Sequence, residues 1–181
     1  MKYAIVFPGQ GSQSLGMLAD LADNFPIVKD TFTEASDALG FDLWALTQND
    51  QAALNQTQNT QPAMLAAGVA TYRALTSEAA LSPVCMAGHS LGEYSALVAA
   101  GALNFSDGIG LVRTRAQLMQ SAVPEGVGAM AAILGLEDEV VVKVCSDYAG
   151  EGIVQAVNFN SNGQVVIAGN KASVELAMAE A

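Results

Sequence analysis

Short apolar runs along the chain alternate with longer segments in which apolar residues recur at helical spacing. Apolar runs bounded by turn residues predict buried strands at 3–7 and 84–87. Apolar residues three or four positions apart predict helix over 20–39, interrupted near Pro26, and less regularly over 43–54. Strands that alternate with helices in this way predict an α/β fold with a parallel sheet.

Proline, serine and small apolar residues indicate where three further helices lie. Residues 61–75 are expected to form one helix, because Pro62 suits the first turn of a helix. Residues 93–100 have helical spacing and directly follow a glycine-rich turn. Ser106 is predicted to cap a helix that ends near Ala122.

The pattern changes near residue 124, after which the predicted order is β-α-β-β-α. The expected elements are strands at 129–134, 153–158 and 164–168, and helices at 137–148 and from Lys171 onward. Asn160-Ser161-Asn162-Gly163 predicts a hairpin turn, because Asn-Gly favours positive φ. This order matches a ferredoxin-like unit without its last strand. We therefore expect two units, at 1–124 and 125–181, each with an incomplete sheet, in a chain that is a fragment.

Composition and charge exclude several classes of protein. With 51% hydrophobic and 14% charged residues, the chain is expected to be globular rather than disordered. A net charge of −11 argues against nucleic-acid binding, which needs a basic face. No apolar run approaches the roughly 18 residues that span a bilayer, and no signal-peptide pattern begins the chain. We therefore expect a cytoplasmic protein without membrane partners.

Sulfur and imidazole groups are too sparse to suggest a metal site. Cys85 and Cys145 lie far apart, in apolar or helical contexts, and are interpreted as reduced core thiols rather than as a disulfide. The sequence contains one histidine and no Cys/His cluster, so no bound metal is expected.

A G-x-S-x-G motif occupies residues 88–92, with Ser90 at its centre. An apolar run precedes the motif and a helical pattern follows it, which is the setting of a nucleophile elbow. In such elbows the N–H after the nucleophile, here that of Leu91, stabilises an oxyanion. A second donor usually comes from a loop after an early strand, where Gln10 lies between two glycines. The alternatives remain that Ser90 merely caps a helix and that the glycines merely form a turn.

A serine nucleophile also needs a base within hydrogen-bond distance. The only histidine, His89, is adjacent to Ser90 in sequence. Adjacent side chains on a sharp turn point apart, so His89 is interpreted as a packing residue rather than as the base. The catalytic base is therefore expected to be missing from this chain.

Two arginines lie on opposite faces of the predicted 106–122 helix. At about 100° per residue, Arg115 falls in the middle of the apolar arc that contains Val112 and Ala116. Arg113 falls on the polar side and is expected to be solvated. An inward guanidinium needs an anion: either an internal carboxylate such as Glu93, or the carboxylate of a substrate, which the planar fork of arginine suits.

Several stretches distributed over the chain form a joint pattern. They are FPGQGSQ at 7–13, TQPA at 60–63, GHSLGEYSAL at 88–97, Arg115 with Met119 and Gln120, and residues 158–169. Together they resemble the malonyl-CoA:acyl carrier protein transacylases of bacterial fatty acid synthesis. The resemblance implies an α/β-hydrolase-like subdomain with an inserted ferredoxin-like subdomain, here from about residue 125 onward.

This resemblance also implies roles for individual residues. Ser90 would take the malonyl group as an ester, Gln10 and Leu91 would provide the oxyanion hole, and Arg115 would hold the free carboxylate. Gln61 would line the site. The implied substrates are malonyl-CoA and acyl carrier protein, with no cofactor beyond CoA and phosphopantetheine.

The implied function is acyl transfer, and two alternatives stay open. Family members are longer than this chain, and their catalytic histidine lies in the part that is absent here, so the chain is expected to be a poor catalyst. The alternatives are a serine acyl hydrolase, or thioesterase, and a non-catalytic fragment.

Overall fold

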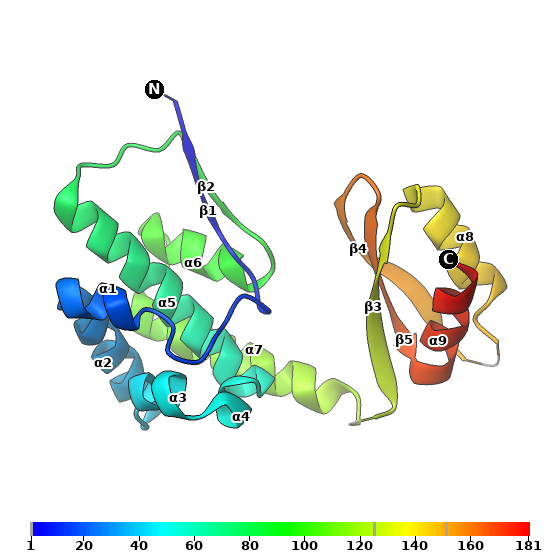
Figure 1. Cartoon of the computed structure of the whole chain (residues 1–181), viewed down its shortest axis with the longest axis horizontal. Helices are drawn as coiled ribbons and strands as arrows, with labels where there is room; N and C mark the ends of the chain where they lie inside the picture. Colours follow the sequence, from blue (N-terminus) through cyan, green and yellow to red (C-terminus); the bar gives the residue numbers. More distant parts are fainter. Residues whose placement is uncertain (1, 125, 151) are drawn as a thin grey trace. The chain divides into compact units, whose positions relative to one another are not determined.

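The computed structural model describes residues 2–124, 126–150 and 152–181, which divide into two compact units, Met1–Gln120 and Ser121–Ala181 (Figure 1). Glu125, at which the second unit was expected to begin, lies outside the described residues. Each unit has its own hydrophobic core and is described separately.

The first unit places helices against a two-stranded parallel sheet (Figure 1). Its elements are β1 (Ala4–Phe7), α1 (Ala19–Asn24), α2 (Ile27–Leu39), α3 (Leu43–Asn49), α4 (Gln51–Leu54), α5 (Thr57–Glu78), β2 (Cys85–Gly88), α6 (Leu91–Ala99) and α7 (Phe105–Ala122). The register runs from Ala4 opposite Cys85 to Phe7 opposite Gly88. The predicted parallel sheet and the break near Pro26 are confirmed.

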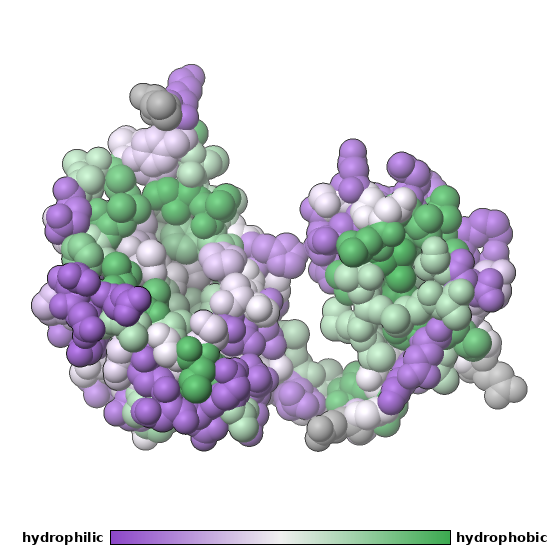
Figure 2. Space-filling view, in the orientation of Figure 1, coloured by the Kyte–Doolittle hydropathy of each residue, from purple (hydrophilic) through white to green (hydrophobic). Residues whose placement is uncertain are grey.

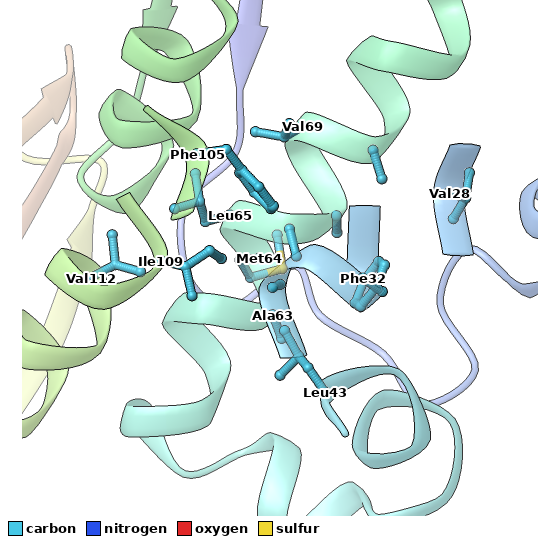
Figure 3. Packing of buried hydrophobic residues seen from close by; sticks show 14 of the residues in the cluster. Val28, Phe32, Leu43, Ala63, Met64, Leu65, Val69, Phe105, Ile109 and Val112 are labelled. Carbon is cyan, nitrogen blue, oxygen red and sulfur yellow. The ribbon is translucent and has the colours of Figure 1, made fainter. Parts of the chain in front are cut away.

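Helix α5 forms the centre of the first core. Figure 3 shows its residue Met64 between Ile109 of α7 and Phe32 of α2. Small residues on several sides of α5 let neighbouring helices approach closely, which explains why residues 59–67 of this helix are buried on all sides. The core thereby fixes α5 relative to α7, and both helices contribute to the site described below.

The segment predicted as one helix at 43–54 is two helices separated at Asp50. The carboxylate of Asp42 accepts a hydrogen bond from the N–H of Ala45 at 2.8 Å, which caps α3. The carboxylate of Asp50 caps α4 in the same way, by accepting a hydrogen bond from the N–H of Ala53 at 2.9 Å. Because the capping aspartate adopts non-helical φ/ψ, the second cap breaks the continuous helix that the pattern predicted.

The prediction that a helix begins at Gln61 and Pro62 is wrong, because α5 begins at Thr57. Its first turn is polar and therefore carries no apolar periodicity. The turn is nevertheless buried: Asn59 donates to the carbonyl of Ala53 at 3.0 Å, and the Thr60 hydroxyl donates to that of Gln56 at 3.0 Å. Pro62 thus lies inside the helix.

The prediction that Ser106 caps α7 is also wrong. The side-chain oxygen of Asn104 accepts from the N–H of Ser106 at 2.9 Å and from that of Asp107 at 3.3 Å. Asparagine is as good a cap as serine, so the helix begins at Phe105, one residue before the expected cap.

The second unit has the β-α-β-β-α order that was predicted (Figure 1). Its elements are β3 (Gly128–Leu134), α8 (Asp138–Asp147), β4 (Val154–Ser161), β5 (Gln164–Asn170) and α9 (Lys171–Glu180). The strands are antiparallel in the order β3-β5-β4. Ser161 pairs with Gln164 across the Asn162–Gly163 turn, where Gly163 has φ 72°, which confirms the predicted hairpin.

In each unit one face of the sheet carries exposed hydrophobic side chains. Val6 of β1 is 74% exposed, and Met130 and Leu134 of β3 are 65% and 67% exposed. Figure 2 shows hydrophobic residues on the viewed surface of both units. Cys85 is also exposed, so the prediction that both cysteines are core thiols is wrong for Cys85 and confirmed for Cys145. None of the described helices combines the length and hydrophobicity that crossing a bilayer requires.

Candidate active site

Ser90 occupies the strained turn between β2 and α6. Its φ of 52° and ψ of −108° lie in a region that residues with a side chain rarely adopt. The Ser90 side chain makes no capping hydrogen bond to α6, which argues against the interpretation that this serine is only a helix cap. The side chain is exposed. This is the geometry of a nucleophile elbow, in which the turn projects the hydroxyl away from the sheet.

The glycines on either side of Ser90 are required by close approach of the backbone. A Cβ atom at Gly88 would overlap the backbone of Gly92 and Glu93, and one at Gly92 would overlap the carbonyl of Phe7. The N–H of His89 also donates to the Phe7 carbonyl at 3.3 Å. The end of β1, the elbow and the start of α6 therefore meet at a single crowded point.

Arg115 of α7 points at Ser90, in line with the inward direction that its helical position predicts. Its Nη2 donates to Ser90 Oγ at 3.0 Å, and its Nη1 donates to Gln61 Oε1 at 2.7 Å. The guanidinium lies 5.7 Å from the ring centroid of Tyr94, one turn into α6. The structure thus brings together three residues that the sequence singled out, from α5, the elbow and α7.

No carboxylate neutralises Arg115 within the part of the chain that the structure describes. The ion pairs found there are Arg73–Glu34, Lys143–Asp147 and Lys171–Glu175. The internal partner considered for Arg115, Glu93, is exposed and is not among them. Among the described residues, the groups that hold the charge of Arg115 are neutral: an amide, a hydroxyl and an aromatic ring. A guanidinium held in this way remains able to bind a carboxylate.

Gln61 is 1% exposed, so its amide must be satisfied inside the protein. Its oxygen accepts from Arg115, and its nitrogen donates to Met119 Sδ at 3.4 Å. Sequence reasoning alone gave Met119 and Tyr94 no role in the site. Helical spacing could have pointed to both, since each lies four residues after a site residue, Arg115 or Ser90.

The expected solvation of Arg113 is wrong. Its guanidinium carbon lies 4.9 Å from the ring centroid of Phe41, and its Nη1 is buried without a hydrogen-bond partner. The helical wheel placed Arg113 on the polar side correctly, but Phe41, in the connection between α2 and α3, covers that side. A single helix contains no signal for such a contact.

Gln10 lies in the turn that follows β1, next to the elbow. A Cβ at Gly9 would lie 2.9 Å from the carbonyl oxygen of His89, so this loop touches the elbow backbone. The side chain of Gln10 points elsewhere, donating to the Thr57 hydroxyl at 3.4 Å. If Gln10 donates to an oxyanion, as the sequence predicts, the donor would therefore be its backbone N–H. Leu91 is the first residue of α6, where N–H groups lack partners within the helix.

Within the described ranges, no cluster of three or more His, Cys, Asp or Glu side chains could hold a metal ion. The chemistry available at the site is that of a hydroxyl, a guanidinium and backbone N–H groups. The arrangement can bind an acyl group that carries a second carboxylate and present a serine oxygen to its carbonyl carbon.

Comparison with known proteins gives a consistent match over nearly the whole chain. The family pattern described as "Acyl transferase domain" matches residues 4–180. The malonyl CoA-acyl carrier protein transacylase of Haemophilus influenzae is 61% identical over 180 residues, which are 98% of this chain and 58% of that protein. The protein of the same name from Escherichia coli strain K12 is 59% identical over 177 residues, 97% of this chain and 57% of that protein.

Solved structures agree with the sequence comparisons. The malonyl CoA-acyl carrier protein transacylase of Coxiella burnetii matches with a TM-score of 0.97 and 51% identity, over 99% of this chain and 57% of that one. A malonyl-transacylase in complex with its type II polyketide synthase acyl carrier protein matches with a TM-score of 0.94 and 58% identity. The match covers 98% of this chain and 58% of that one. The chain thus spans little more than half the length of these relatives. It belongs to the acyl transferase domain family.

Proposed function

We propose that this chain supplies the seryl nucleophile and the carboxylate-binding arginine for transfer of a malonyl group from CoA to acyl carrier protein. The observation that carries the proposal is the guanidinium of Arg115, which has no carboxylate partner among the described residues and donates to Ser90 Oγ at 3.0 Å. An acyl group that reaches Ser90 meets this cation. A malonyl group offers it the carboxylate that the described residues do not.

In the proposed reaction Ser90 Oγ attacks the thioester carbonyl carbon, and its proton passes to a base. The new O–C bond forms, the C–S bond breaks, and CoA leaves as the thiol. The pantetheine thiol of acyl carrier protein then attacks the seryl ester and regenerates the serine hydroxyl. This is covalent catalysis in two half-reactions.

The negative charge that develops on the carbonyl oxygen needs hydrogen-bond donors. We assign the backbone N–H groups of Leu91 and Gln10 to this role. The support is the position of Leu91 at the start of α6, where the helix dipole also favours negative charge, and the contact of the Gln10 loop with the elbow. Loss of one such donor typically costs about 3 kcal/mol of transition-state stabilisation.

The base is proposed to come from outside these 181 residues. The only histidine of the sequence, His89, is adjacent to Ser90, and neighbouring side chains on so sharp a turn diverge. The proposed reaction uses CoA and phosphopantetheine as parts of its substrates and requires no separate cofactor. A cytoplasmic location is part of the proposal and can be tested by fractionating cells that express the chain.

Acyl carrier protein is proposed as the second substrate, and charge limits where it could bind. The chain carries a net charge of −11, and carrier proteins of this pathway are generally acidic. In the second unit both lysines already pair with acidic residues one turn away, Lys143 with Asp147 and Lys171 with Glu175. We therefore expect the carrier contact to depend on other positive groups.

The test is to incubate the chain with malonyl-CoA and locate the added mass by peptide mass spectrometry. A malonyl ester on Ser90 is expected, and none in Ser90→Ala. Absence of any adduct in the wild-type chain would favour the alternative of a non-catalytic fragment. A single turnover suffices for this measurement, so it detects acylation even where the lack of the proposed base makes the step slow.

A serine hydrolase is the other candidate, because the exposed Ser90 is open to water. Labelled malonyl-CoA, with and without acyl carrier protein, separates the two. Label on the carrier supports transfer, whereas free malonate with an unlabelled carrier supports hydrolysis. Arg115→Ala is expected to slow acylation by malonyl-CoA much more than by acetyl-CoA, because only malonyl has a second carboxylate. Equal losses for both would contradict the role of Arg115.

A further inference from the structure

The side chain of Met119 lies beside the proposed acyl site, and the proposed reaction gives it no role. Met119 lies one turn after Arg115 on α7, and its side chain is half exposed. Its sulfur accepts a hydrogen bond from Gln61 Nε2 at 3.4 Å. Gln61 in turn accepts from Arg115 Nη1 at 2.7 Å. The amide therefore bridges two residues of the same helix face.

We infer that Met119 is a positioning residue, which orients the amide of Gln61 and through it the guanidinium that receives the acyl carboxylate; this inference rests on the proposed function. In the opposite orientation the amide nitrogen would face the guanidinium, donor against donor, and the amide oxygen would face the sulfur, acceptor against acceptor. Both contacts therefore select the same orientation.

The burial of Gln61 is what makes this weak acceptor matter. Gln61 is 1% exposed, so water does not easily replace the sulfur as a partner of its N–H groups. In the described part of the chain, Arg113 Nη1 is the buried side-chain nitrogen without a partner, and Gln61 Nε2 is not in that state. A leucine at position 119 would fill similar space and leave the Gln61 nitrogen without its acceptor.

The orientation of the guanidinium follows from that of the amide. Nη1 is held by Gln61, and the ring of Tyr94 lies 5.7 Å from the guanidinium carbon, so Nη2 is directed at Ser90. An arginine restrained in this way loses less conformational freedom when it binds a carboxylate bidentately. Release of the restraint should therefore weaken the binding of dicarboxylic acyl groups and leave monocarboxylic ones almost unchanged.

The test compares Met119→Leu, which removes the acceptor, with Met119→Gln, whose amide oxygen can accept in its place. Acylation of Ser90 by malonyl-CoA and acetyl-CoA is followed by mass spectrometry over a range of concentrations. For Met119→Leu we expect the half-saturating malonyl-CoA concentration to rise roughly three- to tenfold, the effect of one neutral hydrogen bond. Acetyl-CoA should be nearly unaffected, and Met119→Gln should restore the malonyl preference.

The matched control is Met178→Leu, a half-exposed methionine of α9 in the second unit, which should change nothing. An unchanged malonyl-to-acetyl ratio in Met119→Leu would overturn the inference while the proposed function stands. Equal losses for both substrates, or no rescue by Met119→Gln, would overturn it as well, because a merely structural role predicts those outcomes.

A second readout does not require acylation. The side-chain amide resonances of Gln61 in a ¹⁵N NMR spectrum should shift in Met119→Leu and return toward their original positions in Met119→Gln. If the wild-type chain forms no adduct with malonyl-CoA, the proposed function fails, and these resonances still decide whether Met119 orients Gln61. Unchanged resonances in Met119→Leu would refute the contact.

Discussion

At the residue scale, the neutrality of Gln61 is the property on which the proposed acyl site depends. Gln61→Glu would place a carboxylate where the amide oxygen now lies, 2.7 Å from Arg115 Nη1. The guanidinium would then be paired internally, in competition with a substrate carboxylate. We expect acylation of Ser90 by malonyl-CoA to fall roughly ten- to a hundredfold, the range of one charge-assisted hydrogen bond, and acylation by acetyl-CoA to change far less.

The control for the added charge is Gln117→Glu. Gln117 is exposed on α7, two residues after Arg115, so this variant changes the net charge equally without entering the site. It should acylate as the wild-type chain does. A malonyl preference that survives in Gln61→Glu would show that Arg115 does not bind the second carboxylate.

Arg113 has a buried nitrogen without a hydrogen-bond partner, so replacing this charged residue with an apolar one is expected not to destabilise the chain. A buried unsatisfied donor costs about 1–3 kcal/mol, whereas its stacking on an aromatic ring contributes about 1 kcal/mol. A methionine in place of this arginine would keep an unbranched side chain and a favourable contact with Phe41. We expect Arg113→Met to leave the free energy of unfolding in urea unchanged or to raise it by up to about 1 kcal/mol.

Truncation at the same position separates packing from charge. Arg113→Ala removes the stem that covers Phe41 and is expected to lower the free energy of unfolding by about 1–2 kcal/mol. Should Arg113→Met be destabilised as much as Arg113→Ala, the guanidinium itself would be the stabilising group.

At the element scale, the strand–elbow–helix segment depends on the absence of side chains at two glycines. Gly88→Ala would drive a methyl group into the backbone of Gly92 at the start of α6. Overlap with backbone cannot be relieved by a rotamer change, so we expect a loss of about 3 kcal/mol or more in the free energy of unfolding. Chemical denaturation followed by circular dichroism measures the loss.

At Gly110, in the same unit, replacement by alanine is expected to raise the free energy of unfolding, in contrast to Gly88. Gly110 lies inside α7, and a Cβ there would meet nothing within 4 Å. Gly110→Ala is therefore expected to stabilise the chain by about 0.5–1 kcal/mol, because alanine lowers the conformational entropy of the unfolded chain. A Gly88→Ala variant as stable as the wild type would contradict the predicted backbone overlap at the elbow, and a destabilised Gly110→Ala would show that α7 has no room for a side chain at position 110.

The sequence predicted the elements whose signals are local. The elbow and the Asn162–Gly163 turn follow from short motifs with a known geometry, and the parallel sheet of β1 and β2 follows from the alternation of strands and helices. The first turn of α5 could not be predicted in this way. Its polar side chains are buried by hydrogen bonds to backbone carbonyls of α4 and of the connection after it, and such partners leave no periodic pattern.

The same limit applies to the candidate site. Helical spacing predicted the direction of Arg115, because direction is a property of one helix. The partners of a side chain are a property of several elements, so Met119 as the acceptor for Gln61 and Phe41 as the cover for Arg113 were not predicted.

At the scale of the whole molecule, each unit has its own buried core and its own natural probe. Trp44 is the single tryptophan of the sequence and packs edge-on against Phe32, with ring centroids 5.0 Å apart, in the first unit. Cys145 is buried in the core of the second unit. Burial raises the pKa of the Cys145 thiol, so at a given pH a smaller fraction is the reactive thiolate than for an exposed cysteine.

Separate cores predict separate unfolding. In a Cys85→Ser background, which leaves Cys145 as the only thiol, we expect maleimide to label the native chain slowly and the label to enter as urea opens the second unit. The midpoint of this transition should differ from that of Trp44 fluorescence, because the two cores share none of the described residues. Coincident midpoints would mean that the two units unfold as one cooperative structure, and rapid labelling of Cys145 in the native chain would mean that the second core is open without denaturant.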